Sequence, residues 1–176
     1  MDRMKEPASG VSDRPATPSG GDFEAFFEAE HERLLRALFV VTGSAEEADE
    51  LMQDAFVAVW ERWDRVGRMH DPTGYLYRTA MNRFRSRLRS ARAAARRVVR
   101  ADPPPDLFEA VDDRDLVVRA LAKLSVRQRA VLVLTDLRDF DSKEAARILG
   151  IKAATVRALA SQGRTALRKT SEQADE

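Results

Sequence analysis

Two short apolar-patterned segments joined at a glycine, within Asp141 to Gly163, constrain the fold of this chain more than any other stretch. Before the turn, Ala145, Ala146 and Leu149 recur at steps of three and four residues, and Gly150 follows. After the turn, the apolar positions with helical spacing are Ile151, Val156 and Leu159. Small residues where two helices meet, with glycine at the turn, predict a helix-turn-helix. An ordinary helical hairpin is the alternative.

The second helix of such a motif is normally the one that enters the major groove of DNA. That groove is about 12 Å wide and accepts a helix together with its side chains. We therefore expect the segment after Gly150 to contact duplex DNA.

Charge is divided into blocks along the chain, although the net charge is only +1. Residues 22–64 carry −9, residues 65–100 carry +10, residues 101–115 carry −5 and residues 116–170 carry +8. Two basic blocks indicate two surfaces for nucleic acid, and the acidic first block indicates a different partner. Solvated helix faces explain any one block but explain the alternation poorly.

Several classes of protein are disfavoured by what the sequence lacks. There are no cysteines, which suits a reducing cytoplasm, and there is no long apolar run or signal core, so we expect a cytoplasmic protein without membrane insertion. His31 and His70 are the only histidines, and no carboxylate cluster with metal spacing accompanies them. No P-loop is found either. We therefore expect neither an enzyme nor a metal or cofactor.

The periodicity of the chain predicts an all-α fold with two small helical domains joined by a flexible linker. A disordered tail is expected at residues 1–21, the first domain at 22–100, and an acidic, proline-rich linker at 101–115. The second domain is expected at residues 116–170, with an acidic tail at 171–176.

In the first domain, Ser44-x-x-Glu47 offers a capping box for a helix whose apolar side runs from Ala48 to Trp60 and Trp63. The opposite side of this helix is dense in carboxylates and also carries Val57. Carboxylates one turn apart repel each other unless a basic group nearby neutralises them. A solvated face is the default interpretation, and a basic protein partner is the alternative.

After an expected loop at residues 65–70, Asp71 and Pro72 should start the next helix as cap and first residue. Eight arginines and no acid lie between Arg83 and Arg100. Aromatic residues beside such a series fit contact with a nucleic-acid backbone and stacking of unpaired bases.

In the second domain, Ser125-x-x-Gln128 should cap a further helix. We expect three arginines of this domain to lie on its outer surface, namely Arg127, Arg129 and Arg138.

Taken together, three segments resemble a bacterial RNA polymerase sigma factor of the sigma-70 family, and most closely the small extracytoplasmic function (ECF) group. They are EEADELMQDAFVAVW at 46–60, DPTGYLYRTAMNRFRSRLR at 71–89 and LAKLSVRQRAVLVLTDLRDFDSKEAARILGIKAATVRALASQGRTALR at 121–168. The resemblance implies a transcription initiation factor. Its implied partners are core RNA polymerase, promoter DNA and, as a candidate, an anti-sigma factor that clamps both domains.

The resemblance also implies roles for particular residues. The helix at 46–60 would dock on the clamp helices of the largest polymerase subunit through Asp49, Glu50, Gln53 and Asp54. The arginine-rich segment would hold the unwound −10 element, with a base flipped into a pocket beside the preceding loop. The candidate contacts there are Tyr75, Arg78, Asn82, Arg83 and Arg85.

The resemblance assigns the −35 duplex to the helix at 153–164. The candidate contacts are Lys152, Thr155, Arg157, Gln162 and Arg164. Here the chain departs from the family pattern, because Ser161, Gln162 and Gly163 stand where a bulky residue, an arginine and an alanine are usual. Glycine inside a helix costs about 1 kcal/mol relative to alanine.

Two other classes of protein compete with this interpretation. A helix-turn-helix repressor or response regulator would bind duplex DNA independently of polymerase, but a response regulator needs an α/β receiver, and residues 22–100 show helical spacing only. A nuclease would need a metal or histidine site, which the sequence does not offer.

Overall fold

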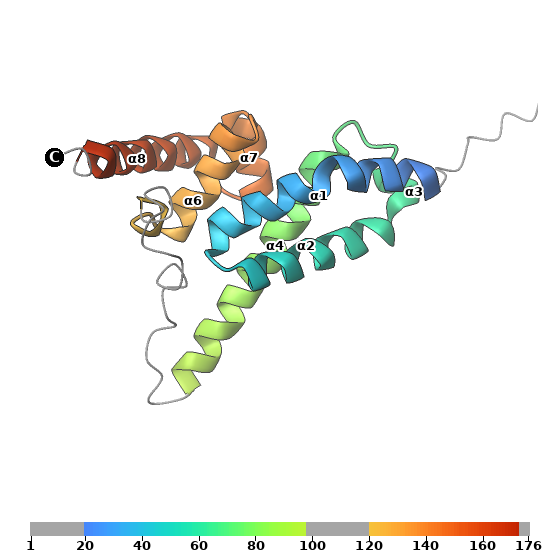
Figure 1. The fold of residues 1–176 in the computed structure, drawn as a ribbon, viewed down its shortest axis with the longest axis horizontal. Helices are drawn as coiled ribbons and strands as arrows, with labels where there is room; N and C mark the ends of the chain where they lie inside the picture. Colours follow the sequence, from blue (N-terminus) through green and yellow to red (C-terminus); the bar gives the residue numbers. More distant parts are fainter. Residues whose placement is uncertain (1–19, 98–119, 173–176) are drawn as a thin grey trace, which may run out of the picture.

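The protein is all-helical over the residues that its computed structural model describes, 20–97 and 120–172. The first part contains α1 (Gly20–Thr42), α2 (Ala45–Trp60), the short α3 (Trp63–Val66) and α4 (Pro72–Arg97). The second part contains α6 (Val126–Leu132), a π-helix that continues it, η2 (Val133–Leu137), then α7 (Ser142–Leu149) and α8 (Ala153–Glu172). The all-α fold with two helical units is therefore confirmed (Figure 1).

The expected tail and linker lie almost entirely outside the described residues. The structure describes nothing before residue 20 and nothing in 98–119, so the linker expected at 101–115 is not covered. Helix α1 begins at Gly20, two residues before the expected start of the first domain.

Local capping explains where the helices of the first unit begin. The Ser44 hydroxyl accepts a hydrogen bond from the Glu47 amide at 3.2 Å and caps α2. The Asp71 carboxylate accepts one from the Gly74 amide at 2.7 Å, and Pro72 is the first residue of α4. These bonds satisfy amides that have no partner inside the helix. Both predicted helix starts are confirmed.

The loop expected at residues 65–70 is shorter than the sequence suggested. Trp63 to Val66 form the one-turn helix α3, and both of these end residues are buried. Two aromatic residues of α1 pack against this turn: Phe23 lies edge-on to Trp63 at 5.2 Å between ring centroids, and the ring of Phe26 lies 5.1 Å from that of Trp63. Burial of Trp63 in this aromatic cluster, together with burial of Val66, keeps the chain helical through residues 65 and 66, where a loop was expected.

The helix-turn-helix forms as predicted. Asp141 caps α7 by accepting bonds from the Lys143 and Glu144 amides at 2.7 and 2.8 Å, and the Glu144 carboxylate returns one to the Asp141 amide. Gly150 ends α7 with φ of +64°, in the left-handed region that favours glycine. Ala145 and Val156 are fully buried where α7 and α8 meet. Small residues at this contact let the two helices approach closely.

Two arginines of the second unit are not exposed, as the sequence had suggested, but buried. Arg129 is only 6% exposed, and its Nη1 lies 3.5 Å from the Leu121 carbonyl oxygen. Arg138, directly after the π-helix, reaches across to Glu30 of α1. The expectation that both lie outside was wrong. The partner of Arg138 is 108 positions away, so local spacing carries no information about it, whereas Arg129 is buried within its own unit, where it reaches back to Leu121. Ser125 does form the predicted capping box with Gln128.

Gly163, which interrupts the family pattern, is a packing residue inside the continuous helix α8. A Cβ added there would lie 2.8 Å from Leu132 Cδ1 and 3.3 Å from Leu132 Cγ. The leucine of α6 therefore occupies the space that a side chain at 163 would need. The expected cost of glycine in a helix is offset here by this close approach of α6 and α8.

Gly163→Leu is expected to destabilise the second unit by about 1–3 kcal/mol, because overfilling a packed contact forces side chains and backbone apart. Urea unfolding of the full chain, followed by circular dichroism, measures the change. Ala158→Leu is the matched control, since Ala158 is exposed on the same helix, and its effect should stay within about 0.5 kcal/mol. Equal unfolding midpoints for the two variants would contradict the packing role.

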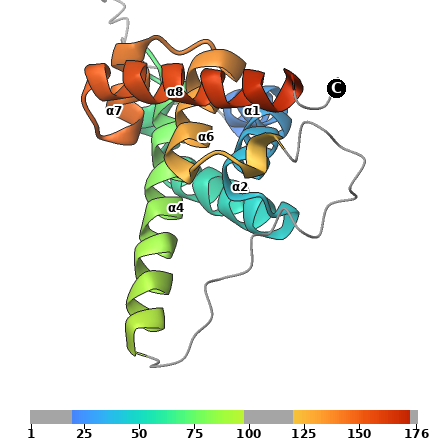
Figure 2. The same ribbon diagram turned by 90° about the vertical axis from the view of Figure 1, so that its left-hand side faces the viewer.

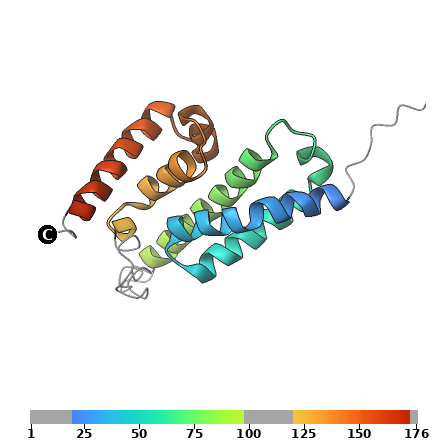
Figure 3. The same ribbon diagram turned by 45° about the horizontal axis from the view of Figure 1, so that its top comes forward.

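The two units lie against each other. In Figure 3, α6, α7 and α8 lie to one side and α1, α2 and α4 to the other, with α4 and α7 adjacent at the boundary. Figure 2 shows the C-terminal part of α4 extending well beyond the other helices. Contacts between the units run from α1 to α6 and η2, and from α4 to α7.

Candidate nucleic-acid interface

The four residues that the sequence nominated on α2 fall into two pairs. Gln53 donates a 2.7 Å hydrogen bond to Asp49, so this pair lies together on the outer side of α2. Glu50 and Asp54 instead accept bonds from Arg87 of α4, at 2.7 and 2.9 Å. Arg87 of α4 therefore binds two of the three carboxylates in this set, Glu50 and Asp54.

Two apolar side chains on the outer side of α2 are exposed. Val57 is 56% exposed and Trp60 is 52% exposed, although the sequence analysis had placed Trp60 in the core. The Trp60 ring still touches Phe23 edge-on at 4.7 Å between centroids. Spacing offered a signal for this face, because 53, 57 and 60 are four and three residues apart and share one side of a helix. Large exposed apolar side chains close together are typical of protein interfaces.

The arginines of α4 divide between two faces. Tyr75, Arg78, Asn82 and Arg85 follow one another at steps of three and four residues and share one face. Arg83 lies on another face, where its guanidinium is 3.8 Å from Asp54. The structure thus keeps four of the five candidate −10 contacts together and directs Arg83 toward α2.

Arg85 is the most constrained of these cations. Burial, together with the nearby Arg89 and Arg78 charges, lowers the pKa of Arg85. Its guanidinium donates to the side-chain oxygen of Asn82 and to the backbone carbonyl of Leu149 in the second unit. A row of three like charges on one face makes that face strongly attractive to a phosphate backbone.

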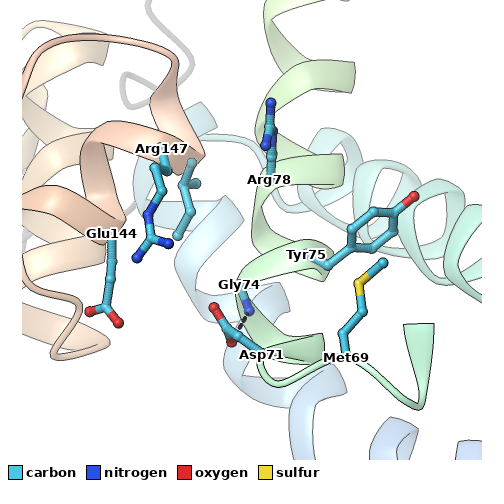
Figure 4. A pocket seen from close by; sticks show the side chains of 8 residues that line it. Met69, Asp71, Gly74, Tyr75, Arg78, Glu144 and Arg147 are labelled. Atoms are coloured by element: carbon cyan, nitrogen blue, oxygen red, sulfur yellow. Dashed lines mark hydrogen bonds between the residues drawn. The ribbon is translucent and has the colours of Figure 1, made fainter. Parts of the chain in front are cut away.

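A cleft of about 250 Å³ lies where the N-terminal end of α4 faces α7 (Figure 4). The wall from the first unit includes Met69, Asp71, Tyr75 and Arg78, and the wall from α7 includes Glu144 and Arg147. In Figure 4, the Tyr75 ring lies beside Met69 and points away from α7. The cleft therefore joins the loop before α4 to the aromatic and basic residues at the start of that helix.

Helix α8 presents its candidate contacts on two flanks. Thr155 and Gln162 are seven residues apart and share one flank, while Arg157 and Arg164 share the other. All four are exposed, and so is Lys152 in the turn before the helix. Arg164 differs from the rest because its Nε and Nη2 bind the Asp136 carboxylate at 2.8 and 2.6 Å. A hydrogen bond from Arg164 holds the pKa of Asp136 below its usual range.

Residues 20–97 and 120–172 offer neither a metal-binding cluster nor a membrane-spanning helix. No group of three or more histidines, cysteines or carboxylates could hold a metal ion there. Over the same residues, no helix is both long and apolar enough to span a membrane.

Comparison with known proteins identifies the family. The sequence matches sigma-70 region 2 over residues 26–94 and sigma-70 region 4 over residues 114–167. It is 31% identical over 151 residues to the ECF RNA polymerase sigma factor SigL of Mycobacterium tuberculosis, an alignment that covers 80% of this chain and 84% of SigL. The chain belongs to the ECF sigma factors. This ECF sigma factor directs RNA polymerase to promoters, and a sigma factor is not an enzyme, as the sequence predicted.

Further similarities agree with this assignment. The ECF sigma factor is 28% identical over 146 residues to SigM of Mycobacterium tuberculosis, covering 82% of this chain and 74% of SigM. Its fold resembles that of the sigma factor RpoE, solved with the anti-sigma factor NepR from Bartonella quintana, with a TM-score of 0.71 and 22% identity over 86% of this chain and 97% of that chain. It also resembles CnrH solved with the cytosolic domain of CnrY, with a TM-score of 0.58 and 25% identity over 86% and 88% of the two chains.

The two matched regions divide the candidate residues of this ECF sigma factor. Region 2 includes α2, α3 and most of α1 and α4, and hence the outer side of α2 and the basic face of α4. Region 4 includes α6, η2, α7 and most of α8. The fold thus places the exposed apolar patch of α2 and the basic face of α4 on neighbouring helices of one region.

Proposed function

We propose that this ECF sigma factor binds core RNA polymerase through the outer side of α2. The surface consists of Asp49 and Gln53 together with the exposed Val57 and Trp60. Exposed apolar side chains beside a carboxylate suit a basic partner helix, because apolar contact supplies affinity while charge orients the partner. Glu50 and Asp54 border this surface and also anchor it to α4 through Arg87. The clamp helices of the largest subunit are the binding partner that the family resemblance implies.

The basic face of α4 captures the displaced strand of the −10 element in this proposal. Three observations support it: the row of Arg78, Asn82 and Arg85, the adjacent Tyr75, and the cleft of about 250 Å³ beside the preceding loop. An unstacked base needs an apolar or aromatic neighbour, which Tyr75 and Met69 offer. Arg83 contributes to the same positive field from the neighbouring face, where Asp54 partly neutralises it.

Helix α8 reads the −35 duplex in this proposal, from its N-terminal half and the turn before it. Lys152 and Arg157 are free to contact phosphates or guanine, and Thr155 and Gln162 offer contacts to thymine and adenine. In this proposal Arg164 approaches the DNA only together with Asp136, because its Nε and Nη2 already donate to the two carboxylate oxygens of Asp136. Because Asp136 occupies two of its donors, Arg164 is better suited to position the helix on the DNA than to read a base directly.

One observation carries the proposal: a protein-binding surface and a strand-binding face lie on the two packed helices α2 and α4, which are bridged by Arg87. Polymerase bound on one helix would therefore bring the opening DNA to the other. Because bacterial RNA polymerase works in the cytoplasm, the proposal places the protein there.

Transcription in vitro with purified core RNA polymerase, over a library of genomic promoters, tests this function. The expected result is initiation at a small set of promoters that core enzyme alone ignores. Tight binding to duplex promoters without polymerase, combined with no specific initiation at any promoter, would instead support an independent helix-turn-helix regulator.

A further inference from the structure

The two regions are joined by an ion pair that is buried between them. Arg138 Nη2 donates to Glu30 Oε2 at 2.9 Å, and the two side chains are only 14% and 9% exposed. Arg33 lies 3.7 Å from the other oxygen of Glu30, but on the exposed side of α1. Removing one partner of such a pair should strongly destabilise the junction between the regions, because the remaining charge then lies where little water can solvate it.

An aromatic contact extends the same junction. Tyr77 of α4 is fully buried, and Phe140, just before α7, packs edge-on against its ring at 5.6 Å between centroids. The Arg138 guanidinium lies 5.1 Å from the centre of that ring, within range of a cation–π interaction. One arginine of region 4 therefore contacts both α1 and α4 of region 2.

The second junction involves the proposed DNA-binding residues themselves. Arg85 donates to the Leu149 carbonyl at the C-terminal end of α7, next to the left-handed turn at Gly150. A Cβ at Gly150 would lie 3.3 Å from Arg85 Nη1, so the turn is seated directly on this guanidinium. An arginine at the C-terminal end of a helix satisfies a carbonyl that has no partner inside the helix.

Helix α7 therefore lies over the face of α4 that carries the proposed −10 contacts. Glu144 and Arg147 of α7 line the same cleft as Tyr75 and Arg78 of α4, although the Tyr75 ring points away from α7 in Figure 4. Further along α4, Arg85 donates both to Asn82 and to the Leu149 carbonyl of α7. A DNA strand that follows this face and helix α7 would occupy the same space.

We propose that this arrangement is a self-inhibited state of the free protein, in which the region 4 helix-turn-helix covers the strand-binding face of region 2. The inference rests on the proposed function of α4. The Glu30–Arg138 pair and the Tyr77–Phe140 contact hold the closed state, although neither belongs to the DNA-binding residues. Opening separates α7 from α4 and frees Arg85, and polymerase shifts the population by binding the two regions apart.

Opening can be followed by energy transfer between two dyes, because the chain has no cysteine of its own. Cysteines replacing the exposed Arg36 on α1 and Lys169 on α8 label the two regions of the full chain. The variants are Glu30→Lys, Arg138→Glu and the double swap. Transfer is expected to be high in the parent chain, to fall in each single variant, and to recover in the double variant. Core polymerase should lower it in the parent chain.

Binding of a mixed-sequence single-stranded DNA by free protein gives the second measurement. Both single variants should bind at least about tenfold more tightly than the parent, because a competent state that is rarely populated reduces the apparent affinity by its fraction. The two substitutions change net charge in opposite directions. Non-specific attraction would therefore move their affinities apart, whereas opening moves both the same way.

Phe140→Ser should open the junction without changing the net charge. It replaces the charge variants if circular dichroism shows that one of them does not fold. Low energy transfer in the parent chain, or unchanged transfer and DNA affinity in Phe140→Ser and both single variants, would overturn the closed state. Transcription with core polymerase keeps the two hypotheses apart. A parent chain that initiates specifically but shows no closure refutes only the self-inhibition, and a chain that closes but never initiates refutes the proposed function.

Discussion

Val57→Glu is expected to weaken binding to core RNA polymerase by at least about thirtyfold, which corresponds to a loss of about 2 kcal/mol or more. Val57 is among the most exposed large apolar side chains of the described chain, and it lies one turn from Gln53 and from Trp60 on the same side of α2. Apolar residues at the centre of an interface exclude water from the polar contacts around them. A buried glutamate there would lose its hydration without a partner. Titration of core enzyme against labelled protein, followed by fluorescence anisotropy, measures the change.

The matched control for this variant is Ala25→Glu, which adds the same charge at an exposed position of α1, in the same helical unit. It should leave the affinity for core enzyme within about twofold, because a rim or remote charge contributes little. Loss of binding in both variants would point to general charge repulsion. Full affinity in Val57→Glu would remove the outer side of α2 from the polymerase interface.

A charge-reversal test on α2 requires a choice between Asp49 and Asp54, which the sequence alone does not distinguish. Asp49 and Asp54 are equivalent by spacing, and lysine at both would be the direct test of an acidic docking face. In the structure, Asp54 binds Arg87 and lies near Arg83, so lysine there would also break the contact between α2 and α4. Asp49→Lys is therefore the cleaner reversal, since its hydrogen-bond partner is Gln53 on the same helix.

The parts of the fold that the sequence predicted correctly depend on local interactions. Ser44, Asp71, Ser125 and Asp141 each cap a helix within three residues of themselves, so their roles follow from short sequence patterns. Gly150 is required by its positive φ, which the pattern of two helices around one glycine already implied. The acidic and basic blocks also correctly separated α2 from α4.

The parts that the sequence missed depend on residues far apart in the chain. Glu30 and Arg138 are 108 positions apart, and each belongs to an ordinary amphipathic segment when taken alone. Arg129 was also expected outside and is buried, although the carbonyl that its guanidinium contacts, that of Leu121, is only eight positions away. Trp60 fits both sides of α2 by spacing, and only the position of Phe23 shows which part of its ring stays exposed. Without the tertiary arrangement, the junction between the regions cannot be deduced, and spacing alone does not decide whether Trp60 belongs to the core or to the exposed patch.

Arg85→Ala and Arg87→Ala are expected to have different effects, although the two arginines are only two residues apart on α4. Arg85 shares the face of Arg78 and Asn82, whereas Arg87 faces α2 and binds Glu50 and Asp54. Loss of a phosphate contact lowers the slope of log affinity against log salt by about one, so Arg85→Ala should flatten the salt dependence of promoter-complex formation. Arg87→Ala should leave the slope unchanged and lower the stability of region 2 by at most about 1 kcal/mol, because the pair is largely exposed.

The measurement must use the complete polymerase complex, because Arg85 also contacts Leu149 in the free protein. In the free chain, alanine at 85 would both remove a DNA contact and loosen α7 from α4, and the two effects on strand binding oppose each other. Polymerase holds the regions apart in either variant, so the slope then reports the DNA contact alone. Equal slopes for the parent chain and Arg85→Ala would exclude this face from the −10 strand. A flattened slope in Arg87→Ala would instead show that the strand crosses to the side of α4 that faces α2.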